Sequence, residues 1–294
     1  MTRQHYRIIG SHSAAKLCGW LKKSIRDGGF CYKQKFYGIQ SHRCLQMTPW
    51  IGCCNRCVYC WRVIEKNPIK FDKIDEPKDI VESSIEAQRK LISGFPGWEG
   101  TNMKKWKEAN SPNNAAISLV GEPTMYPKIS ELIREFKKQG FTTFLVTNGQ
   151  FPERLEEMAG SSEPAQLYIS LDAPDSRIYK RIDRPMLPDF WKRLEKSLEI
   201  MNSFSCRKVI RLTMVKGWNM ARPEEYAKLI ERSGCDFVEV KGYMHVGESQ
   251  KRLPRDAMPY HKDVQEFAGQ LSKESGYAYA DEQKESRVVL LSAK

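Results

Sequence analysis

The sequence predicts an α/β protein with six strand–helix units, arranged as a partly open, TIM-like (β/α)6 barrel. Short apolar runs alternate with segments of 3.6-residue periodicity, which is the pattern of parallel strands joined by crossover helices. Six such runs are present rather than the eight of a closed barrel, so we expect a partial barrel. The predicted strands are residues 47–51, 116–120, 143–146, 167–171, 209–215 and 237–240.

Three amphipathic stripes predict helices between and after these strands. One face of each helix is expected to pack in the core. The stripes are Ile129, Leu132, Ile133 and Phe136; Phe190, Leu194, Leu198 and Met201; and Tyr260, Val264, Phe267 and Leu271. Residues 95–114 interrupt the alternation and predict a long inserted loop with room for a short helix.

Polar or turn-forming groups follow several of the predicted strands. They are GEP at 121–123, NG at 148–149, DAP at 172–174 and KG at 216–217. In parallel α/β folds the functional groups gather at the carboxyl edge of the sheet, so we expect the site there.

The positive charge of the chain is concentrated near its N-terminus. Residues 1–62 hold 11 Lys and Arg against one acid, Asp27, whereas the whole chain holds 48 basic and 36 acidic residues. A local excess of this size attracts polyanions such as nucleic acid, although a solubilising basic surface has the same composition. We therefore expect a basic N-terminal extension, residues 1–46, followed by the barrel and a C-terminal extension, residues 47–294.

The composition also limits the class of protein. At 40% hydrophobic residues the chain can bury a core, and no apolar run approaches the ~20 residues of a membrane span. No hydrophobic signal segment follows the polar start of the sequence, so we expect a soluble, cytoplasmic protein. Nine cysteines in a reducing compartment favour metal ligation over disulfides, and seven of them lie between Cys18 and Cys60.

Cys53, Cys57 and Cys60 form a CxxxCxxC motif directly after the first predicted strand. Three thiolates on one short loop suit three irons of a [4Fe–4S] cluster and leave the fourth iron open for a ligand. Cys54 creates a second frame, CxxCxxC, and we treat it as a neighbour of the cluster. A zinc site is the alternative, and it needs a fourth ligand from Cys31, Cys44 or a histidine.

This motif resembles that of the radical S-adenosylmethionine (SAM) superfamily, in which the open iron binds SAM and an electron cleaves it to a 5′-deoxyadenosyl radical. The resemblance implies an aromatic contact with the adenine and a GGE-type motif for the SAM amino group, with further contacts at strand ends. The implied cofactor-binding residues are Tyr59, Gly121, Glu122, Asn148, Ser170 and Asp172. Taken alone, residues 121–123 predict only a helix-entry turn.

Cys18, Cys31 and Cys44 lie upstream, with twelve residues between successive cysteines. Spacing alone is compatible with scattered structural cysteines. Together with YCWR and the stretches ISLVGEPTMYP, FLVTNGQ, LYISLDAPD and VEVKGYMHVG, however, it closely resembles the tRNA 4-demethylwyosine synthases over residues 18–247. The resemblance implies two [4Fe–4S] clusters, the second held by these three cysteines in the N-terminal extension.

The same resemblance implies a reaction of the lyase class with carbon–carbon chemistry. The enzyme would join pyruvate carbons to N1-methylguanosine at position 37 of phenylalanine tRNA, closing the tricyclic base 4-demethylwyosine. The radical would take hydrogen from the N-methyl group, and pyruvate would bind at the second cluster. Lys33 is the implied catalytic Schiff-base lysine, Lys35 is the alternative, and either could instead contact a phosphate or carboxylate.

The expected partners are the anticodon loop of tRNA-Phe, pyruvate and an external electron donor of flavodoxin or ferredoxin type. Eukaryotic members carry a flavodoxin-like domain for which the chain before Cys18 has no room, so we expect the short, archaeal-type form, acting as a monomer. Trp61, Trp98 and Trp106, with Lys104, Lys105 and Lys107, are candidate tRNA contacts. Each of these tryptophans could equally belong to the core.

Two alternatives follow from the same residues. A glycyl-radical-activating enzyme would share the CxxxCxxC motif and the barrel, but it has no use for the upstream cysteines or the basic segment. A zinc-binding RNA-binding module would explain the charge and the thiols, but it leaves the GEP segment and the six strand–helix units without a role.

Overall fold

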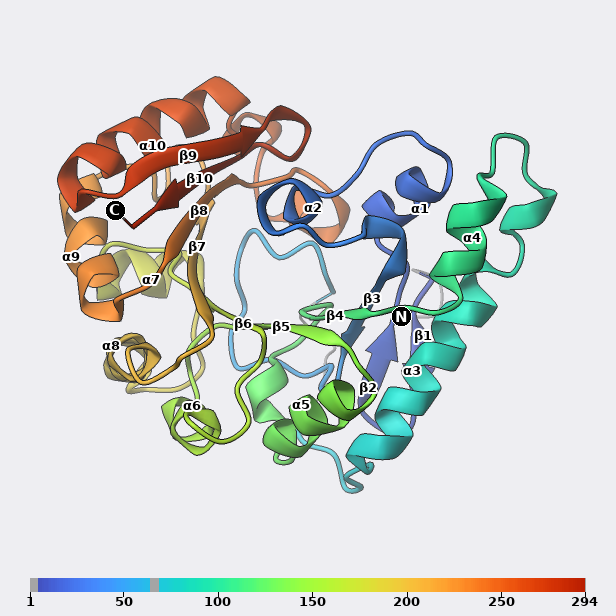
Figure 1. Cartoon of the computed structure of the whole chain (residues 1–294). Coiled ribbons are helices and arrows are strands. Elements are labelled where there is room, and N and C mark those ends of the chain that lie inside the picture. The colour runs from blue at the N-terminus through green and yellow to red at the C-terminus, as the bar shows by residue number, and fades with distance from the viewer. Residues whose placement is uncertain (1–4, 64–68, 294) are drawn as a thin grey trace. The chain divides into compact units, whose positions relative to one another are not determined.

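A computed structural model describes residues 5–63 and 69–293 of the chain (Figure 1). The chain forms two compact units, of which the first comprises Met1–Gly52 and Pro68–Val146, and the second comprises Cys53–Asn67 and Thr147–Lys294. Within the described ranges no helix is both long and apolar enough to cross a membrane.

The strands of the first unit are ordered β1-β2-β3-β4-β5. Their bounds are β1 (Arg7–Ile9), β2 (Ser13–Ala15), β3 (Cys44–Thr48), β4 (Asn114–Ile117) and β5 (Thr142–Thr147). β3, β4 and β5 are parallel, and β1 and β2 add an antiparallel pair beside β3. The helices of this unit are α1 (Gly19–Ile25), α2 (Tyr32–Tyr37), α3 (Pro77–Ile92), α4 (Met103–Ala109) and α5 (Ile129–Lys138), with the short 3-10 helices η2 (Ser41–Arg43), η3 (Phe95–Gly97) and η4 (Pro123–Met125).

The second unit repeats this plan with three parallel strands and an antiparallel pair. Its strands are ordered β6-β7-β8-β10-β9, with β6 (Gln166–Ser170), β7 (Arg207–Met214), β8 (Phe237–Gly242), β9 (Ala278–Gln283) and β10 (Val288–Ser292). β6, β7 and β8 are parallel, whereas β10 pairs antiparallel with both β8 and β9. The helices are α6 (Pro152–Met158), α7 (Ser176–Ile182), α8 (Phe190–Met201), α9 (Pro223–Ser233) and α10 (His261–Ser275), with η5 (Gly247–Lys251), η6 (Arg255–Ala257) and η7 (Lys284–Ser286). Helices α6, α8, α9 and α10 pack side by side in that order (Figure 1).

All six predicted strands are confirmed, and the first two begin and end earlier than predicted. β3 ends at Thr48 because Pro49, which follows it, has no backbone N–H to donate to the ladder. β4 ends at Ile117 because the amides of Ser118 and Leu119 both donate to the carbonyl of Met47, at 3.0 and 3.1 Å, which breaks the regular pattern.

Two of the predicted helix stripes are confirmed, and the third needs a correction. All four residues of the α5 stripe are fully buried, and in α8 the stripe is buried from Leu194 onward. Tyr260, which the third stripe included, is not in the core: it is the extended residue before α10, and its side chain is 70% exposed.

The inserted loop is more ordered than the sequence predicted. It contains η3 and α4, and the Trp106 ring packs against a core formed by Leu17, Leu21, Ile25, Ile92, Phe95 and Ala109. The Trp106 indole N–H donates to the carbonyl of Ile92 at 3.0 Å, and Lys105 forms an ion pair with Asp27 at 2.5 Å. The Trp106 ring is thus partly buried against this core, in line with the core alternative for this residue, and its contact with tRNA stays a prediction. Trp98, by contrast, is exposed, with the Arg26 guanidinium 4.0 Å from the centre of its ring.

Candidate active site

The CxxxCxxC loop of the second unit is fixed by backbone hydrogen bonds to the end of α7. The amide of Arg56 donates to the carbonyl of Asp183 at 2.9 Å, and the amide of Val58 donates to that of Ile182 at 2.8 Å. The Val58 side chain is fully buried, so the loop is anchored between its last two motif cysteines, Cys57 and Cys60. Cys53, Cys57 and Cys60 are each half-buried on this loop.

Two arginines bind carbonyl groups of the same loop. Arg56 donates to the carbonyl of Cys53 at 2.7 Å. Arg252 donates to the carbonyl of Val58 at 3.2 Å and also to the carbonyl of Cys60. Arg252 was not singled out in the sequence, because no local motif marks a residue that lies nearly two hundred positions after the loop it contacts.

Cys54 differs from its neighbours because it is 4% exposed. The side-chain amide of Asn148, directly after β5, lies 3.3 Å from the Cys54 sulfur and 3.9 Å from the Cys53 sulfur. This burial favours the CxxxCxxC frame, in which Cys54 is a neighbour of the cluster. Asn148 is thus brought to the cysteine loop, as expected for the carboxyl end of a parallel strand.

Tyr59 connects the loop to two buried carboxyl groups. Its hydroxyl donates to Asp172 at 2.6 Å and to Asp183 at 2.8 Å. Burial raises the pKa of Asp172, and burial together with the charge of Asp172 raises the pKa of Asp183. The other Asp172 oxygen accepts the amide of Thr213 at 2.6 Å, so this carboxyl group is held by protein donors on both sides. Asp183 is a second residue that the sequence did not reveal.

Ser170 is the last residue of β6, and in the parallel register it lies beside Arg211 of β7. Arg211 in turn forms an ion pair at 2.8 Å with Glu239 of β8, whose side chain is fully buried. A row of polar groups therefore crosses the three parallel strands of the second unit, from the last residue of β6 to the middle of β7 and β8. The contacts of Tyr59, Asn148, Ser170 and Asp172 with SAM stay predictions.

In the first unit, Gly121 and Glu122 form a tight turn after β4. Gly121 has φ +73°, and a Cβ atom there would lie 2.1 Å from the carbonyl oxygen of Trp50, so only glycine fits. The Glu122 amide donates to the carbonyl of Gly52 at 2.8 Å. Its carboxylate is 2% exposed and accepts the Thr124 amide and hydroxyl, at 3.0 and 2.7 Å, as the cap of η4. The predicted helix-entry turn is therefore present, and a contact with the SAM amino group stays a prediction.

The first unit also brings together the three widely spaced cysteines. Cys18 precedes α1, Cys31 precedes α2 and Cys44 begins β3. Burial, with smaller contributions from the charges of Cys18 and Cys31, raises the pKa of Cys44 to about 12, and the charge of Lys33 opposes this rise. The three thiols and Lys33 therefore lie close enough to interact electrostatically.

Lys33 and Lys35 occupy different environments on α2. Lys33 is 7% exposed, and its ammonium nitrogen lies 4.7 Å from the centre of the Phe144 ring, whereas Lys35 is exposed. Of these two lysines, Lys33 is the buried one, and it lies in the same unit as the three half-buried thiols.

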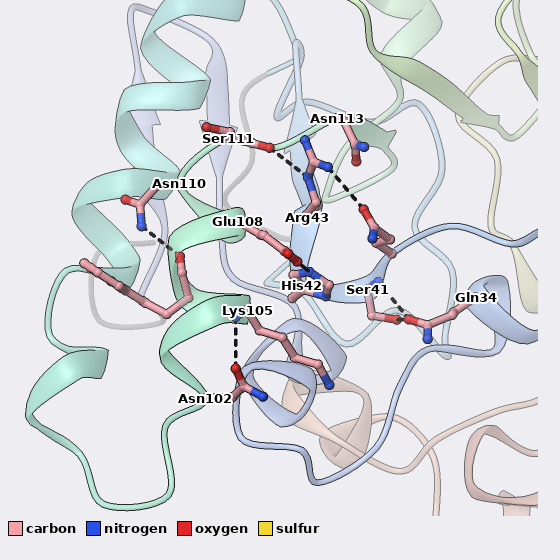
Figure 2. A network of polar contacts seen from close by, with 12 residues as sticks. Gln34, Ser41, His42, Arg43, Asn102, Lys105, Glu108, Asn110, Ser111 and Asn113 are labelled. Carbon is pink, nitrogen blue, oxygen red and sulfur yellow. Dashed lines mark hydrogen bonds and ion pairs between the residues drawn. The ribbon is translucent and has the colours of Figure 1, made fainter.

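A network of polar contacts supports the segment between Cys31 and Cys44 (Figure 2). The Ser41 hydroxyl accepts the Cys31 amide at 2.9 Å and donates to Gln34 at 2.9 Å. His42 contacts Glu108 of α4 at 2.6 Å, and Arg43 donates to the carbonyl of Ser111 at 3.0 Å. Helix α4 of the inserted loop thus holds the chain that leads into Cys44.

Both thiol sets have the donor chemistry of an iron–sulfur site. Each set offers three thiols, one fewer than the irons of a [4Fe–4S] cluster, which leaves one iron for a ligand that is not protein. Over residues 5–63 and 69–293, no three His, Cys, Asp or Glu side chains are placed to hold one metal ion together. A [4Fe–4S] cluster does not need three ligands on one ion, because each thiolate binds a different iron.

Comparisons with known proteins assign the family. A model described as "Radical SAM superfamily" matches residues 47–230, and one described as "Wyosine base formation" matches residues 232–293. The S-adenosyl-L-methionine-dependent tRNA 4-demethylwyosine synthase of Pyrococcus horikoshii is 52% identical over 294 residues, covering 98% of this chain and 86% of the relative. The chain belongs to the tRNA 4-demethylwyosine synthase family. The rice member is 42% identical, and the match covers 99% of this chain and 45% of that relative.

Solved structures agree with this assignment. One described as "Structure of TYW1 with a lysine-pyruvate adduct bound" has a TM-score of 0.90 and 40% identity, and the match covers 99% of this chain and 93% of that one. "Crystal structure of archaeal TYW1" has a TM-score of 0.82 and 36% identity with the same coverage. Streptococcus suis SuiB, at 18% identity and a TM-score of 0.53, shares the fold alone.

As a tRNA 4-demethylwyosine synthase, the chain is a radical SAM enzyme of wyosine formation that acts on tRNA with SAM and a [4Fe–4S] cluster. The predicted α/β fold, a partial barrel of the radical SAM type, is confirmed. The two alternatives, a glycyl-radical-activating enzyme and a zinc-binding RNA-binding module, do not agree with this family assignment.

Proposed function

We propose that this synthase joins pyruvate carbons to N1-methylguanosine at position 37 of tRNA-Phe and closes the third ring of 4-demethylwyosine, a lyase-class reaction with carbon–carbon chemistry. The observation that carries the proposal is the position of Lys33, buried beside Cys18, Cys31 and Cys44. A similar protein, 40% identical, has been solved with a lysine–pyruvate adduct bound. Lys33 is our candidate for the equivalent lysine.

The second [4Fe–4S] cluster is part of the proposal. Residues 1–46 supply its three ligands, and a position without a protein ligand can take the carboxylate and carbonyl oxygens of pyruvate. The basic segment around it, 11 Lys and Arg against one acid over residues 1–62, attracts this small anion as well as the tRNA.

Lys33 acts as the nucleophile toward the pyruvate ketone. Its amine adds to the carbonyl carbon, and loss of one water molecule leaves an imine between Nζ and the former ketone carbon. The Lys33 side chain is buried, and its Nζ atom lies 4.7 Å from the centre of the Phe144 ring, so the amine is held inside the first unit. Lys35 is exposed and lacks this environment.

The Cys53, Cys57 and Cys60 loop is our candidate for the SAM site, with Tyr59, Gly121, Glu122, Asn148, Ser170 and Asp172 as binding residues. When bound there, the cluster supplies the electron that cleaves SAM and so starts hydrogen abstraction from the N-methyl group of the guanine. The chain's own residues position the reactants: Asn148 contacts the cysteine loop, and the Tyr59–Asp172 pair fixes the loop to the end of β6. We propose an external flavodoxin- or ferredoxin-type donor and a monomeric enzyme.

The test is to trap the pyruvate imine. Anaerobic, reconstituted protein is incubated with ¹³C-labelled pyruvate and cyanoborohydride, digested, and analysed by mass spectrometry, while nucleosides from treated tRNA-Phe are analysed in parallel. We expect the label on the peptide that contains Lys33, and no label and no tricyclic nucleoside with Lys33→Ala. Lys35→Ala is the matched control and should keep both. Label on Lys35, or normal product from Lys33→Ala, would contradict the proposal.

A further inference from the structure

A cavity of about 710 Å³ lies in the second unit, and none of the residues that line it is assigned to the clusters or to SAM. Its inner wall is Lys216, Gly217 and Trp218, directly after β7, and its outer wall comes from residues 254–258, Tyr260 and Arg287. A backbone hydrogen bond of 2.9 Å from the Lys216 amide to the carbonyl of Ala257 joins the two walls. A volume of several hundred Å³ is in the range that holds a nucleotide-sized ligand.

The charged groups around this cavity are mostly cationic. Lys216, Arg255 and Arg287 line it together with a single acid, Asp256. The Lys216 ammonium lies 3.3 Å from Asp263 and is 53% exposed, so it still faces solvent. Arg287 donates to the carbonyl of Pro259 at 2.6 Å, which fixes its guanidinium at the wall. The excess of positive charge suits an anionic ligand.

The cavity also carries two aromatic rings, and neither belongs to the hydrophobic core. Tyr260 is 70% exposed, which is unusual for a ring of this size, and the Arg287 guanidinium lies 5.7 Å from its centre. The Arg181 guanidinium lies 4.3 Å from the centre of the Trp218 ring. Exposed aromatic rings among cations are the usual means by which proteins stack bases of single-stranded RNA while contacting phosphates.

The position of the cavity agrees with a substrate site. Lys216 follows β7 at the carboxyl edge of the parallel strands, the edge at which Ser170 ends β6 and Asp172 follows it. Its outer wall lies within residues 232–293, which the "Wyosine base formation" model matches and the "Radical SAM superfamily" model, ending at residue 230, does not. The segment specific to this family therefore supplies Arg255, Tyr260 and Arg287.

We propose that this cavity binds a nucleotide of the substrate tRNA next to the base under modification. The base stacks on Tyr260, and the phosphates contact Lys216, Arg255 and Arg287. The inference rests on the proposed function, in which position 37 of the tRNA reaches the same edge of the sheet. An acidic electron-donor protein would also be attracted by the charge, but the aromatic rings and the concave shape favour a nucleotide.

The test distinguishes the contribution of the Tyr260 ring to tRNA binding from the contribution of the positive charge. Tyr260→Ser removes the ring and places a small hydroxyl side chain at the residue before α10, a position that serine favours. Arg255→Gln removes one charge. Lys262→Gln is the control, because Lys262 lies two residues beyond Tyr260, is 84% exposed and does not line the cavity. Affinity for tRNA-Phe is measured by fluorescence anisotropy across a salt series, and circular dichroism confirms folding.

We expect Tyr260→Ser to weaken tRNA binding about tenfold with an unchanged salt slope, as loss of a stacked base predicts. Arg255→Gln should weaken binding and reduce the salt slope by roughly one. SAM cleavage without tRNA should stay at the wild-type rate in both variants. Tyr260→Phe should bind tRNA nearly as wild type, which separates loss of the ring from misfolding.

Two results would overturn the inference. The first is that both variants bind tRNA with the same affinity as Lys262→Gln. The second is that tRNA binding is unchanged while reduction by a flavodoxin is slower, which would assign the cavity to the electron donor. Failure of the proposed function gives a different result. In that case wild-type protein makes no tricyclic base from pyruvate, while the two variants still lose tRNA affinity and the inference stands.

Discussion

Arg252 contacts the cysteine loop through the backbone rather than through the thiols. Its guanidinium donates to the carbonyls of Val58 and Cys60, on either side of Tyr59. Groups that orient ligand-bearing segments typically change metal affinity by roughly ten- to a hundredfold when they are removed. We expect Arg252→Gln to release cluster iron to a chelator about tenfold faster than wild type. Lys251→Gln is the control, because Lys251 is exposed and pairs only with Glu248 in the described chain.

Gly121 provides a second prediction at the level of one residue. A Cβ atom at Gly121 would meet the carbonyl oxygens of Trp50 and Gly52, whereas at Gly140, with φ +77°, it would meet nothing within 4 Å. Gly140→Ala should therefore lower the free energy of unfolding by about 1 kcal/mol, through backbone strain alone. Gly121→Ala should lower it by about 2 kcal/mol more because of the clash. Urea unfolding measures both, and equal losses in the two variants would show that the turn can relax.

Lys33 and Lys35 show the limit of sequence reasoning at this scale. The family resemblance pointed to Lys33 and left Lys35 as the alternative, because burial depends on how α2 lies in its unit. The structure buries Lys33 and exposes Lys35. Trp106 shows the same limit: its lysine-rich neighbours suggested a nucleic-acid contact, whereas the structure packs its partly buried ring against the core that contains Leu21 and Ile92.

Among the elements, the central parallel strands were predictable and the peripheral antiparallel ones were not. Buried parallel strands are continuous apolar runs, and amphipathic stripes after three of the six supported the alternation of strands and helices. β1 and β2 have three residues each, which is too short for a periodicity to emerge. β9 is mostly exposed, and β10 is apolar but has no helix after it, so a search for strand–helix units passes over both.

The junction between α6 and β7 depends on one carboxylate. Glu163 accepts hydrogen bonds from the amides of Gly160, Ser205 and Cys206, at 2.8 to 3.2 Å, and from the Ser205 hydroxyl at 2.8 Å. Burial acts to raise the pKa of Glu163, but these hydrogen bonds outweigh it and the pKa is lowered in the folded state. The stabilisation is therefore complete above the unfolded pKa of about 4.3 and is lost as the pH falls through the lower folded value.

This linkage gives a pH-dependent prediction. At pH 7 Glu163→Gln should lower the free energy of unfolding of the metal-free protein by about 1–3 kcal/mol, since an amide nitrogen cannot accept these bonds. The difference from wild type should shrink below about pH 4, as the wild-type carboxylate is protonated. Urea unfolding between pH 3.5 and 7 tests this. Glu157→Gln, at an exposed pair with Arg154, should change stability by less than about 0.5 kcal/mol at any pH.

For the whole molecule, the central question is whether the chain carries two clusters or one. The CxxxCxxC loop was recognisable because its three cysteines are local in sequence. The other three converge only after α1, α2 and β3 have folded, which spacing cannot establish. The structure supplies that convergence within the first unit, while the CxxxCxxC loop lies in the second.

Iron and acid-labile sulfide per chain decide this question. Anaerobically reconstituted wild type should hold about eight irons, and Cys18→Ala/Cys31→Ala/Cys44→Ala about four. The triple variant should still cleave SAM, because the CxxxCxxC loop is intact, and it should lose the pyruvate adduct on Lys33 because the neighbouring iron is gone. Cys206→Ala, which removes a half-buried thiol outside both sets, should keep about eight irons. About four irons in wild type and triple variant alike would make the upstream cysteines structural and would remove the second cluster from the proposed reaction of Lys33 with pyruvate.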